Sequence, residues 1–204
     1  MAAVPVLVFT DFTSPFCHVA EAALRRLEGE GLAAPRYAAF ELYPAGAALP
    51  AAPLPDEIAA ARPLADELGI ALAAPGAMPR TRKAHEAAKF AAARGVEREM
   101  REAVFAAYFR DGRDVGRIDV LVELGAALGL DATELKVVLD VDSLSGAVAA
   151  DEALARRLGI AAVPALVVGA GADAELVTGA LPYAELRALL ERKQGGGDRP
   201  SPER

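Results

Sequence analysis

The chain has 204 residues, of which 53% are hydrophobic and 25% are charged, and its formal net charge is -7. These values indicate one globular domain, or one domain with an insertion, that is large enough for a sizeable core. The acidic balance argues against a nucleic-acid partner and against an anionic membrane partner, because both favour basic surfaces.

Two features of the sequence bear on its location. Residues 1–10 lack a basic n-region, and the apolar run after Pro5 is too short for a secretory h-region or a membrane span. Cys17 is the only cysteine, and a single unpaired cysteine suits a reducing compartment, since an exported domain would risk intermolecular pairing. We therefore expect a cytoplasmic protein.

The chain opens with a β-α-β pattern. The apolar residues 4–10 predict a buried strand, and residues 15–28 predict a helix. Ser14 is expected to be the N-cap of this helix and Pro15 its first residue, because the hydroxyl accepts an orphan N–H and proline has none to lose. Residues 36–42 predict a second strand.

A mostly helical block is expected from the end of a Pro- and Ala-rich loop, residues 43–55, to about residue 141. Asp131 and Glu134 form a D-x-x-E pattern, which predicts a capping box. Other residues at helical spacing predict apolar stripes that must be buried. These are Met100, Val104, Phe105, Tyr108 and Phe109 in one helix, and Leu121, Leu124 and Leu128, followed by a capping Gly129, in another.

The last part of the chain predicts a return to strands. A helix at 145–158 is expected to end at Gly159. After it, the pattern predicts a strand within 160–168, a hairpin turn at 169–173, a strand at 175–178, a closing helix at 181–193, and a disordered tail at 194–204.

The chemistry of the chain centres on Ser14 and Cys17, which form an S-x-x-C motif where a helix follows a strand. With one sulfur no internal disulfide can form, so we expect no dithiol oxidase reaction. A helix N-terminus stabilises an anion by about 0.3 to 2 kcal/mol, which could lower the pKa of a thiol from about 8.5 to about 7. Cys17 is therefore either a reactive thiol or a small buried core residue.

Ser14 has a different expected role. A serine hydroxyl is far too weak an acid for the same stabilisation to ionise it, so Ser14 is better suited to donate a hydrogen bond to a bound sulfur than to act as a nucleophile. The alternative is that Ser14 and Pro15 are an ordinary N-cap pair.

The order of elements, the S-x-x-C motif and the late Val163-Pro164 pair together resemble the DsbA-like branch of the thioredoxin superfamily, and most closely its FrnE-type oxidoreductases. The resemblance covers nearly the whole chain except its tail. The supporting segments are FEL at 40–42, TRKAH at 81–85, AVFAAYF at 103–109, GLD at 129–131, GIAAVPAL at 159–166 and VTGALP at 177–182.

This resemblance implies an α/β fold, namely a thioredoxin-like fold with an all-helical insertion. The implied organisation has four parts. They are a β-α-β part at 1–45, a helical insertion at 46–142, a β-β-α return at 143–193 and a disordered tail at 194–204.

The resemblance also implies a substrate groove. In the family the late proline is cis and faces the active-site helix. The resemblance assigns this role to Pro164, with Val163 as the residue before it. A cis bond leaves the preceding backbone groups open to a peptide or glutathione. Taken alone, Pro164 would more simply be a trans proline that starts a strand. Pro15 and Phe16 are expected to line the same thiol-binding site.

The motif departs from both groups of relatives. FrnE-type proteins usually carry C-P-W-C, whereas Ser14 replaces the first cysteine here. Serine in an S-P-F setting is similar to hydroxychromene-carboxylate isomerases and kappa-class glutathione transferases, whose serine holds the thiol of glutathione. In those relatives position 17 is usually not cysteine, and the asparagine expected near position 80 is Arg80 in this chain.

The chain has two histidines. His18 either tunes a sulfur or packs partly buried, and we expect packing, since adjacent helix residues point about 100° apart. His85 either binds an acidic ligand together with Arg80 and Arg82 or lies on a helix surface among solvated charges, and we expect the surface position. No metal site is expected, because two histidines and one cysteine lack zinc spacing.

Three functions stay open from the sequence. The first is a DsbA/FrnE-like protein whose monothiol site handles glutathione or another small thiol, by a mixed disulfide at Cys17 or by thiol activation at Ser14. The second is a glutathione-dependent isomerase or transferase of an aromatic substrate, with an apolar loop at 40–54 lining its pocket. The third is a non-catalytic binding protein. Because relatives often associate, a homodimer is also open.

Overall fold

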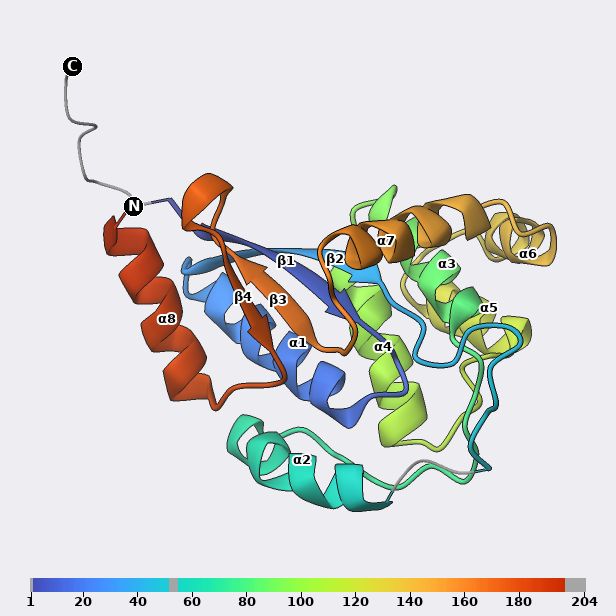
Figure 1. Cartoon of the computed structure of the whole chain (residues 1–204). Coiled ribbons are helices and arrows are strands. Elements are labelled where there is room, and N and C mark those ends of the chain that lie inside the picture. The colour runs from blue at the N-terminus through green and yellow to red at the C-terminus, as the bar shows by residue number, and fades with distance from the viewer. Residues whose placement is uncertain (1, 52–54, 197–204) are drawn as a thin grey trace.

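The computed structural model describes residues 2–51 and 55–196 (Figure 1). Residues 52–54 of the expected pocket loop and residues 197–204 of the expected tail lie outside the described residues. In chain order the elements are β1 (Val4–Thr10), α1 (Pro15–Gly29), β2 (Ala33–Ala39), α2 (Pro55–Leu68), α3 (Arg82–Ala92), α4 (Glu97–Phe109), α5 (Ile118–Ala127), α6 (Ala132–Asp140), α7 (Ser145–Arg157), β3 (Ala165–Val168), a 3-10 turn (Gly171–Asp173), β4 (Glu175–Thr178) and α8 (Tyr183–Gly196).

The four strands form one sheet in the order β2-β1-β3-β4. Strands β1 and β2 run parallel and are joined through α1, whereas β3 pairs antiparallel with β1 and β4 pairs antiparallel with β3. The predicted β-α-β start and the predicted hairpin return are therefore confirmed, and they share one sheet. The α/β thioredoxin-like fold class is confirmed as well.

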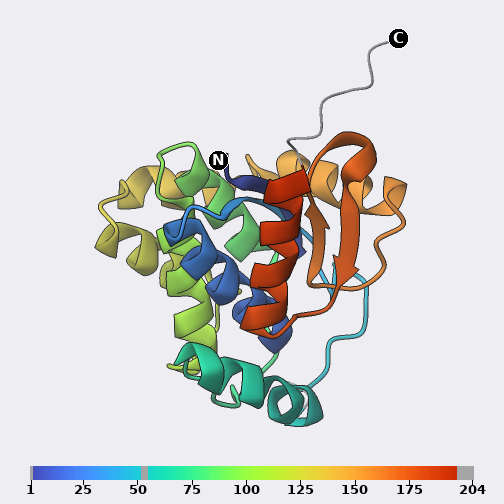
Figure 2. The same ribbon diagram turned by 90° about the vertical axis from the view of Figure 1, so that its left-hand side faces the viewer.

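Strand β1 contributes side chains to a core on each face of the sheet, since alternate residues of a strand point to opposite sides. Val4, Val6 and Val8 belong to a core that includes Leu24 of α1 and Leu190 of α8. The opposite side contributes Phe9 to a second core with residues of α7, namely Leu154 and Ala155. The sheet thus lies between α1 and α8 on one face and α7 on the other, as Figure 2 shows for α1 and α8.

A third core fills the helical part of the molecule. All five residues of the predicted stripe from Met100 to Phe109 are buried in it, together with Phe12 and Cys17. Helices α3, α4, α5 and α6 pack on one another, while α2 contacts α1 and α8. No helix within the described residues is both long enough and apolar enough to cross a membrane.

The predicted helix boundaries follow from their capping residues. Ser14 accepts the backbone N–H of Cys17 at the start of α1, and Asp131 accepts that of Glu134 at the start of α6. The capping box at α6 is one-sided, since the Glu134 carboxylate pairs with Arg94. Gly159 adopts a φ of 69° just after α7, the left-handed conformation that glycine allows at a helix end.

One predicted strand has wrong boundaries, and another is confirmed. Strand β2 is Ala33–Ala39 and not 36–42, because its parallel register pairs Val4 with Ala33 and Thr10 with Ala39, so both strands end together. Strand β3 is Ala165–Val168, within the predicted range 160–168. Its ladder with β1 begins only after Pro164, a residue that has no N–H to donate.

The C-terminal helix also extends further than predicted. Helix α8 runs from Tyr183 to Gly196 and not over 181–193, so the first three residues of the expected disordered tail are helical. Gln194 there donates from its side-chain amide to the carbonyl of Ala2.

Candidate functional site

The N-terminus of α1 lies at the carboxyl end of β1, four residues after Thr10. Ser14 has an extended backbone with φ -86° and ψ 119°, and its Oγ accepts the N–H of Cys17 at 3.3 Å. Pro15 is the first helical residue, as predicted. Ser14 is only 4% exposed, whereas Phe16 is half-buried.

The Val163-Pro164 peptide is cis, as the resemblance implied. The next residue, Ala165, is paired with Phe9, so the antiparallel register brings Pro164 beside the end of β1. The carbonyl of Pro164 accepts the N–H of Gly179 at 2.7 Å. The sheet therefore brings the proline segment, the β1–α1 loop and the segment after β4 to one end of the molecule.

Cys17 does not have the properties of a reactive thiol. Its side chain is fully buried, and the backbone N–H of Asp11 donates to Sγ at 3.5 Å. Burial raises the pKa of the thiol to about 12, although hydrogen bonds from Ser14 and Asp11 oppose this. The expected fall to about 7 at a helix N-terminus is wrong, because desolvation of the thiolate outweighs the helix dipole.

The fully buried Asp11 carboxylate organises the loop that leads to Ser14. Its Oδ1 accepts the N–H and the hydroxyl of Thr13, both at 2.7 Å, and its Oδ2 accepts the N–H of Leu42 at 2.7 Å and the hydroxyl of Thr81 at 3.0 Å. Burial raises the pKa of Asp11 in spite of these four donors. One side chain thus joins the β1–α1 loop to the segment after β2 and to the start of α3.

Sequence reasoning missed Asp11 as a site residue, although a signal was present. An Asp whose carboxylate accepts the N–H two residues later forms an Asx turn, which is common where a strand leads into a loop. Asp11-Phe12-Thr13 has that spacing, and here the turn holds the N-cap in place.

Arg80 binds backbone carbonyls instead of a ligand. Its guanidinium donates to the carbonyls of Tyr43 at 2.7 Å, Pro44 at 2.6 Å and Ala47 at 2.7 Å. Three such bonds fix the loop that follows β2. The arginine in place of the expected asparagine is therefore a loop anchor.

Arg82 lies between two carboxylates. One of its terminal nitrogens is 2.6 Å from Oε2 of Glu41, an ion pair whose angles fall outside hydrogen-bond geometry, and 3.5 Å from Oε2 of Glu152. Burial raises the pKa of Glu41 to about 7, and Arg82 opposes the shift. The charge of Arg82 is thus matched within the protein, which does not favour the predicted binding of an acidic ligand.

His85 is buried, so the expected surface position is wrong. The residue is 1% exposed, and its ring lies 4.9 Å from the ring of Phe12. In the part of the chain that the structure describes, neither ring nitrogen has a hydrogen-bond partner. Burial lowers the pKa of His85 well below its usual value, and the charges of Arg101, Lys89 and Arg82 add to this. His85 packs behind the β1–α1 loop as a neutral side chain.

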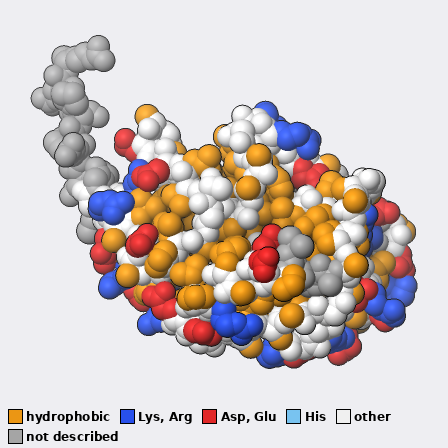
Figure 3. Space-filling model, turned by 60° about the horizontal axis from the view of Figure 1, so that its bottom comes forward, with side chains coloured by type: hydrophobic (Ala, Val, Ile, Leu, Met, Phe, Trp, Pro, Cys, Tyr) orange, Lys and Arg blue, Asp and Glu red, His pale blue; other side chains and the backbone are white. Residues whose placement is uncertain are grey.

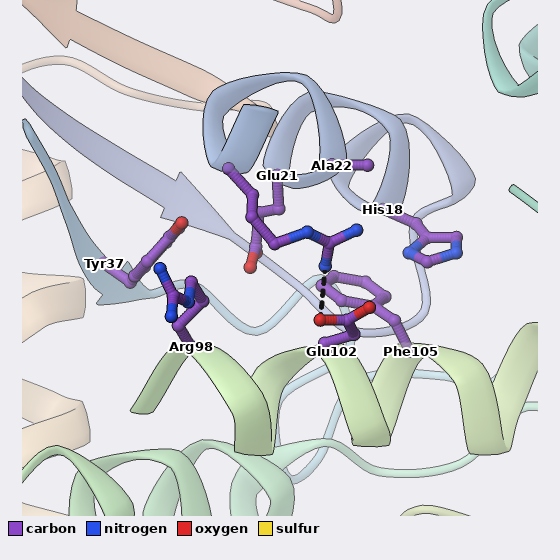
Figure 4. Close-up of a pocket in the computed structure, with 8 residues that line it drawn as sticks. His18, Glu21, Ala22, Tyr37, Arg98, Glu102 and Phe105 are labelled. Atoms are coloured by element: carbon purple, nitrogen blue, oxygen red, sulfur yellow. Dashed lines mark ion pairs between the residues drawn. The ribbon is translucent and has the colours of Figure 1, made fainter. Parts of the chain in front are cut away.

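His18 is a packing residue, as expected. Its ring stacks on Phe105 and Phe109, with centroid distances of 4.9 and 5.5 Å. It lines a shallow polar pocket between α1, β2 and α4, which Figure 4 shows with the ion pair of Arg25 and Glu102 across it. Burial, with a smaller effect of Arg25, lowers the pKa of His18 to about 4.

A buried ion pair fastens α1 to α4. Arg101 donates to both oxygens of Glu21, at 2.7 and 2.6 Å, and the hydroxyl of Thr10 donates to Glu21 at 2.6 Å. The guanidinium also lies over the rings of Phe12 and Tyr37. This pair supports the helix that presents Ser14. Among the described residues no group of three His, Cys, Asp or Glu side chains is placed to hold a metal ion.

A comparison with protein families matches residues 5–191 of the chain to the DSBA-like thioredoxin domain. The chain is 29% identical to the uncharacterized protein YwbO of Bacillus subtilis (strain 168) over 150 residues, which are 67% of this chain and 72% of YwbO.

Solved structures show the same fold. The probable DsbA oxidoreductase SCO1869 from Streptomyces coelicolor has a TM-score of 0.78 and 24% identity, with 98% of this chain and 93% of that chain covered. A 2-hydroxychromene-2-carboxylate isomerase has a TM-score of 0.74 and 19% identity, with 94% and 95% covered. The cytosolic disulfide reductase DsbM from Pseudomonas aeruginosa with GSH has a TM-score of 0.70 and 20% identity, with 94% and 99% covered.

Proposed function

The chain belongs to the family of DSBA-like thioredoxin domains, and we propose that it binds glutathione or another small thiol and activates it at the N-terminus of α1. In this proposal the sulfur lies beside Ser14, with Pro15, Phe16, Val163 and Pro164 around it. The thiol gives its proton to solvent and is held as the thiolate.

The observation that supports this role most directly is the geometry of the Ser14 hydroxyl. Its oxygen accepts the N–H of Cys17, and in this proposal its hydroxyl proton, which otherwise interacts with the Cys17 thiol, donates to the bound sulfur. Pro15 has no N–H, and the N–H of His18 bonds to the carbonyl of Ser14. The N–H of Phe16 is then the donor of this first turn that a bound anion would use.

These donors are suited to a thiolate. A helix N-terminus stabilises an anion by about 0.3 to 2 kcal/mol, and one pKa unit corresponds to about 1.36 kcal/mol. A bound thiol with an ordinary pKa would therefore ionise about one unit lower. Because Ser14 is buried, a thiol can contact it only when a neighbouring segment moves aside.

A mixed disulfide at Cys17 is the weaker of the two routes. Thiol–disulfide exchange requires an accessible thiolate, and Cys17 is fully buried with a raised pKa. Ser14 is thus the residue proposed to activate the bound thiol, and Cys17 packs behind it.

The solved relatives agree with a thiol ligand. DsbM has a structure with GSH, and it is described as cytosolic. A cytoplasmic location, where small thiols are kept reduced, is part of the proposal. Activation of a bound thiol would serve a reductase and an isomerase or transferase equally, so the proposed step does not depend on the later reaction.

The test is a titration of the folded protein with two thiols, glutathione and benzyl mercaptan. Calorimetry measures binding, and the ultraviolet absorbance of the thiolate measures ionisation of the bound thiol. We expect at least one of them to bind with a thiol pKa lowered by about one unit. Ser14→Ala should weaken binding about tenfold and remove part of the pKa change.

A matched control separates thiol binding from helix capping. Asp131→Ala removes a comparable N-cap at the remote helix α6, and it should lower stability by about 1 kcal/mol without changing thiol affinity. The proposal is wrong if neither thiol binds the wild type, or if Ser14→Ala binds with unchanged affinity and thiol pKa.

A further inference from the structure

We infer that the thiol substrate of this site carries an apolar, uncharged substituent, and that the site disfavours the two carboxylates of glutathione. This inference rests on the proposed function and specifies the chemical class of its substrate. It follows from the charges, contacts and apolar side chains of the segments that surround the N-terminus of α1.

Besides the start of α3, which Thr81 joins to Asp11, four segments meet at this end of the molecule. The loop 11–14 lies against the segment after β2, since the N–H of Phe40 bonds to the carbonyl of Thr10 and that of Leu42 bonds to Asp11. The proline segment joins through the pairing of β3 with β1, and the segment after β4 joins through the N–H of Gly179. A thiol beside Ser14 is therefore surrounded by these segments.

None of the four segments contains a lysine or an arginine. Their only acidic residues are Asp11 and Glu41, and their only histidine is His18, which lies in the separate pocket of Figure 4. The ranges are 10–18, 40–51, 159–165 and 178–183. A glutathione carboxylate bound at this end would find no basic partner within them.

The two nearby arginines are already engaged. The Arg80 guanidinium makes three bonds to loop carbonyls, and Arg82 lies between the carboxylates of Glu41 and Glu152. A ligand anion would compete with these partners for each guanidinium, and binding through the same N–H groups would leave the partners unpaired. Desolvated acceptors left behind in this way are costly, so the arginines act as structural cations.

Acidic side chains also lie near this end of the molecule. Tyr43 follows Leu42 in the chain, and its pKa is raised by burial and then by the negative charges of Glu57 and Asp11. Glu57 belongs to the first turn of α2. A ligand with two carboxylates would approach these groups against repulsion, whereas a neutral ligand would not.

The same segments offer apolar surface. Several hydrophobic residues are half-buried and so keep part of their surface available, namely Phe16, Phe40, Leu42, Tyr43, Val163 and Ala180. Figure 3 shows the lower face of the molecule, where hydrophobic side chains form a broad area with few charged ones among them. Burying an apolar substituent there gains about 25 cal/mol per Å².

The test compares glutathione with glutathione diethyl ester, which has the same thiol and the same backbone but no carboxylates. At low ionic strength we expect the ester to bind about tenfold more tightly, and the ratio to shrink in high salt because screening weakens the repulsion. Benzyl mercaptan should bind at least as well as the ester. The inference is overturned if glutathione binds as tightly as the ester or more tightly.

A variant that introduces a positive charge gives a second readout. Ala162 is exposed and precedes Val163, so Ala162→Lys would place a cation at the edge of the site. It should improve glutathione binding several-fold without improving the binding of the ester, whose remaining charge is its ammonium group, while the matched control Ala162→Gln should change neither. Equal effects of Lys and Gln on glutathione would contradict the inference.

The two proposals fail in different ways. If no thiol binds, charged or uncharged, the proposed function fails and the inference fails with it. If thiols bind in a Ser14-dependent manner but glutathione is preferred over its ester, the function stands and only the inference about the substrate class is wrong.

Discussion

The carboxylate of Asp11 accepts the backbone N–H of Leu42 at 2.7 Å, which joins the loop before α1 to the segment after β2. The same carboxylate accepts three further hydrogen bonds, two from Thr13 and one from Thr81. Three separate parts of the chain thus meet at one buried side chain, directly before the N-cap of α1.

Asp11→Ala should therefore destabilise the protein strongly. The substitution leaves buried donors without an acceptor, and each such group costs about 1 to 3 kcal/mol. We expect the free energy of unfolding to fall by about 2 to 4 kcal/mol in urea titrations. As a control, Asp140→Ala removes an exposed ion pair with Lys136 and should cost less than about 1 kcal/mol. Equal effects of the two variants would show that the Asp11 network contributes little.

Local signals in the sequence predicted much of the fold. The helix starts at Ser14 and Asp131 and the helix end at Gly159 depend on side chains or glycines within a few residues, so they could be located from the sequence. The boundaries of β2 could not, because its end is set by the register with β1 and not by its own residues.

The site was harder to predict for the same reason. The helix dipole at Cys17 is a local effect, but the pKa of its thiol is decided by burial under side chains from distant helices. His85 was expected on a surface because charged residues flank it in the sequence, yet its own helix face packs against Phe12. Burial of one residue among charged neighbours is a tertiary property.

The Cys17 thiol should be protected from alkylation in the folded protein. At a pKa of about 12, the thiolate fraction near neutral pH is about a thousandfold below that of a free cysteine. We expect iodoacetamide labelling, followed by mass spectrometry, to be slower by at least that factor in buffer than in denaturant. The single cysteine makes the readout unambiguous. Rapid labelling of the folded chain would restore Cys17 as a reactive residue.

His18 should make stability depend on pH. Its folded pKa of about 4 lies below the unfolded value of 6.5, so the unfolded chain binds the proton more readily. The contribution of His18 to the free energy of unfolding is fully present above pH 6.5 and is lost as the pH falls towards 4. The total loss is about 3 kcal/mol. We expect the stability difference between wild type and His18→Phe to follow this curve in urea unfolding.

Comparing the free energies of unfolding of wild type and His18→Phe at each pH removes the contributions of Glu41 and His85, which both proteins share. Glu41 has a raised pKa and His85 a lowered one, so their effects on stability have opposite signs. A stability difference that stays constant from pH 7 to pH 4 would mean that His18 titrates alike in the folded and unfolded chains.

Two helical glycines should respond in opposite directions to substitution by alanine. A Cβ at Gly125 would lie 2.5 Å from Cδ2 of Leu135, whose side chain is fully buried, whereas a Cβ at Gly146 has no heavy atom within 4 Å. Gly125→Ala should lower the free energy of unfolding by about 1 to 3 kcal/mol, because Leu135 must leave its packed position. Gly146→Ala should raise it by about 0.5 to 1 kcal/mol, since alanine restricts the unfolded chain and favours helix. Thermal unfolding of the two variants beside the wild type measures both shifts, and a Gly125→Ala variant as stable as the wild type would contradict the packing of α5 against α6.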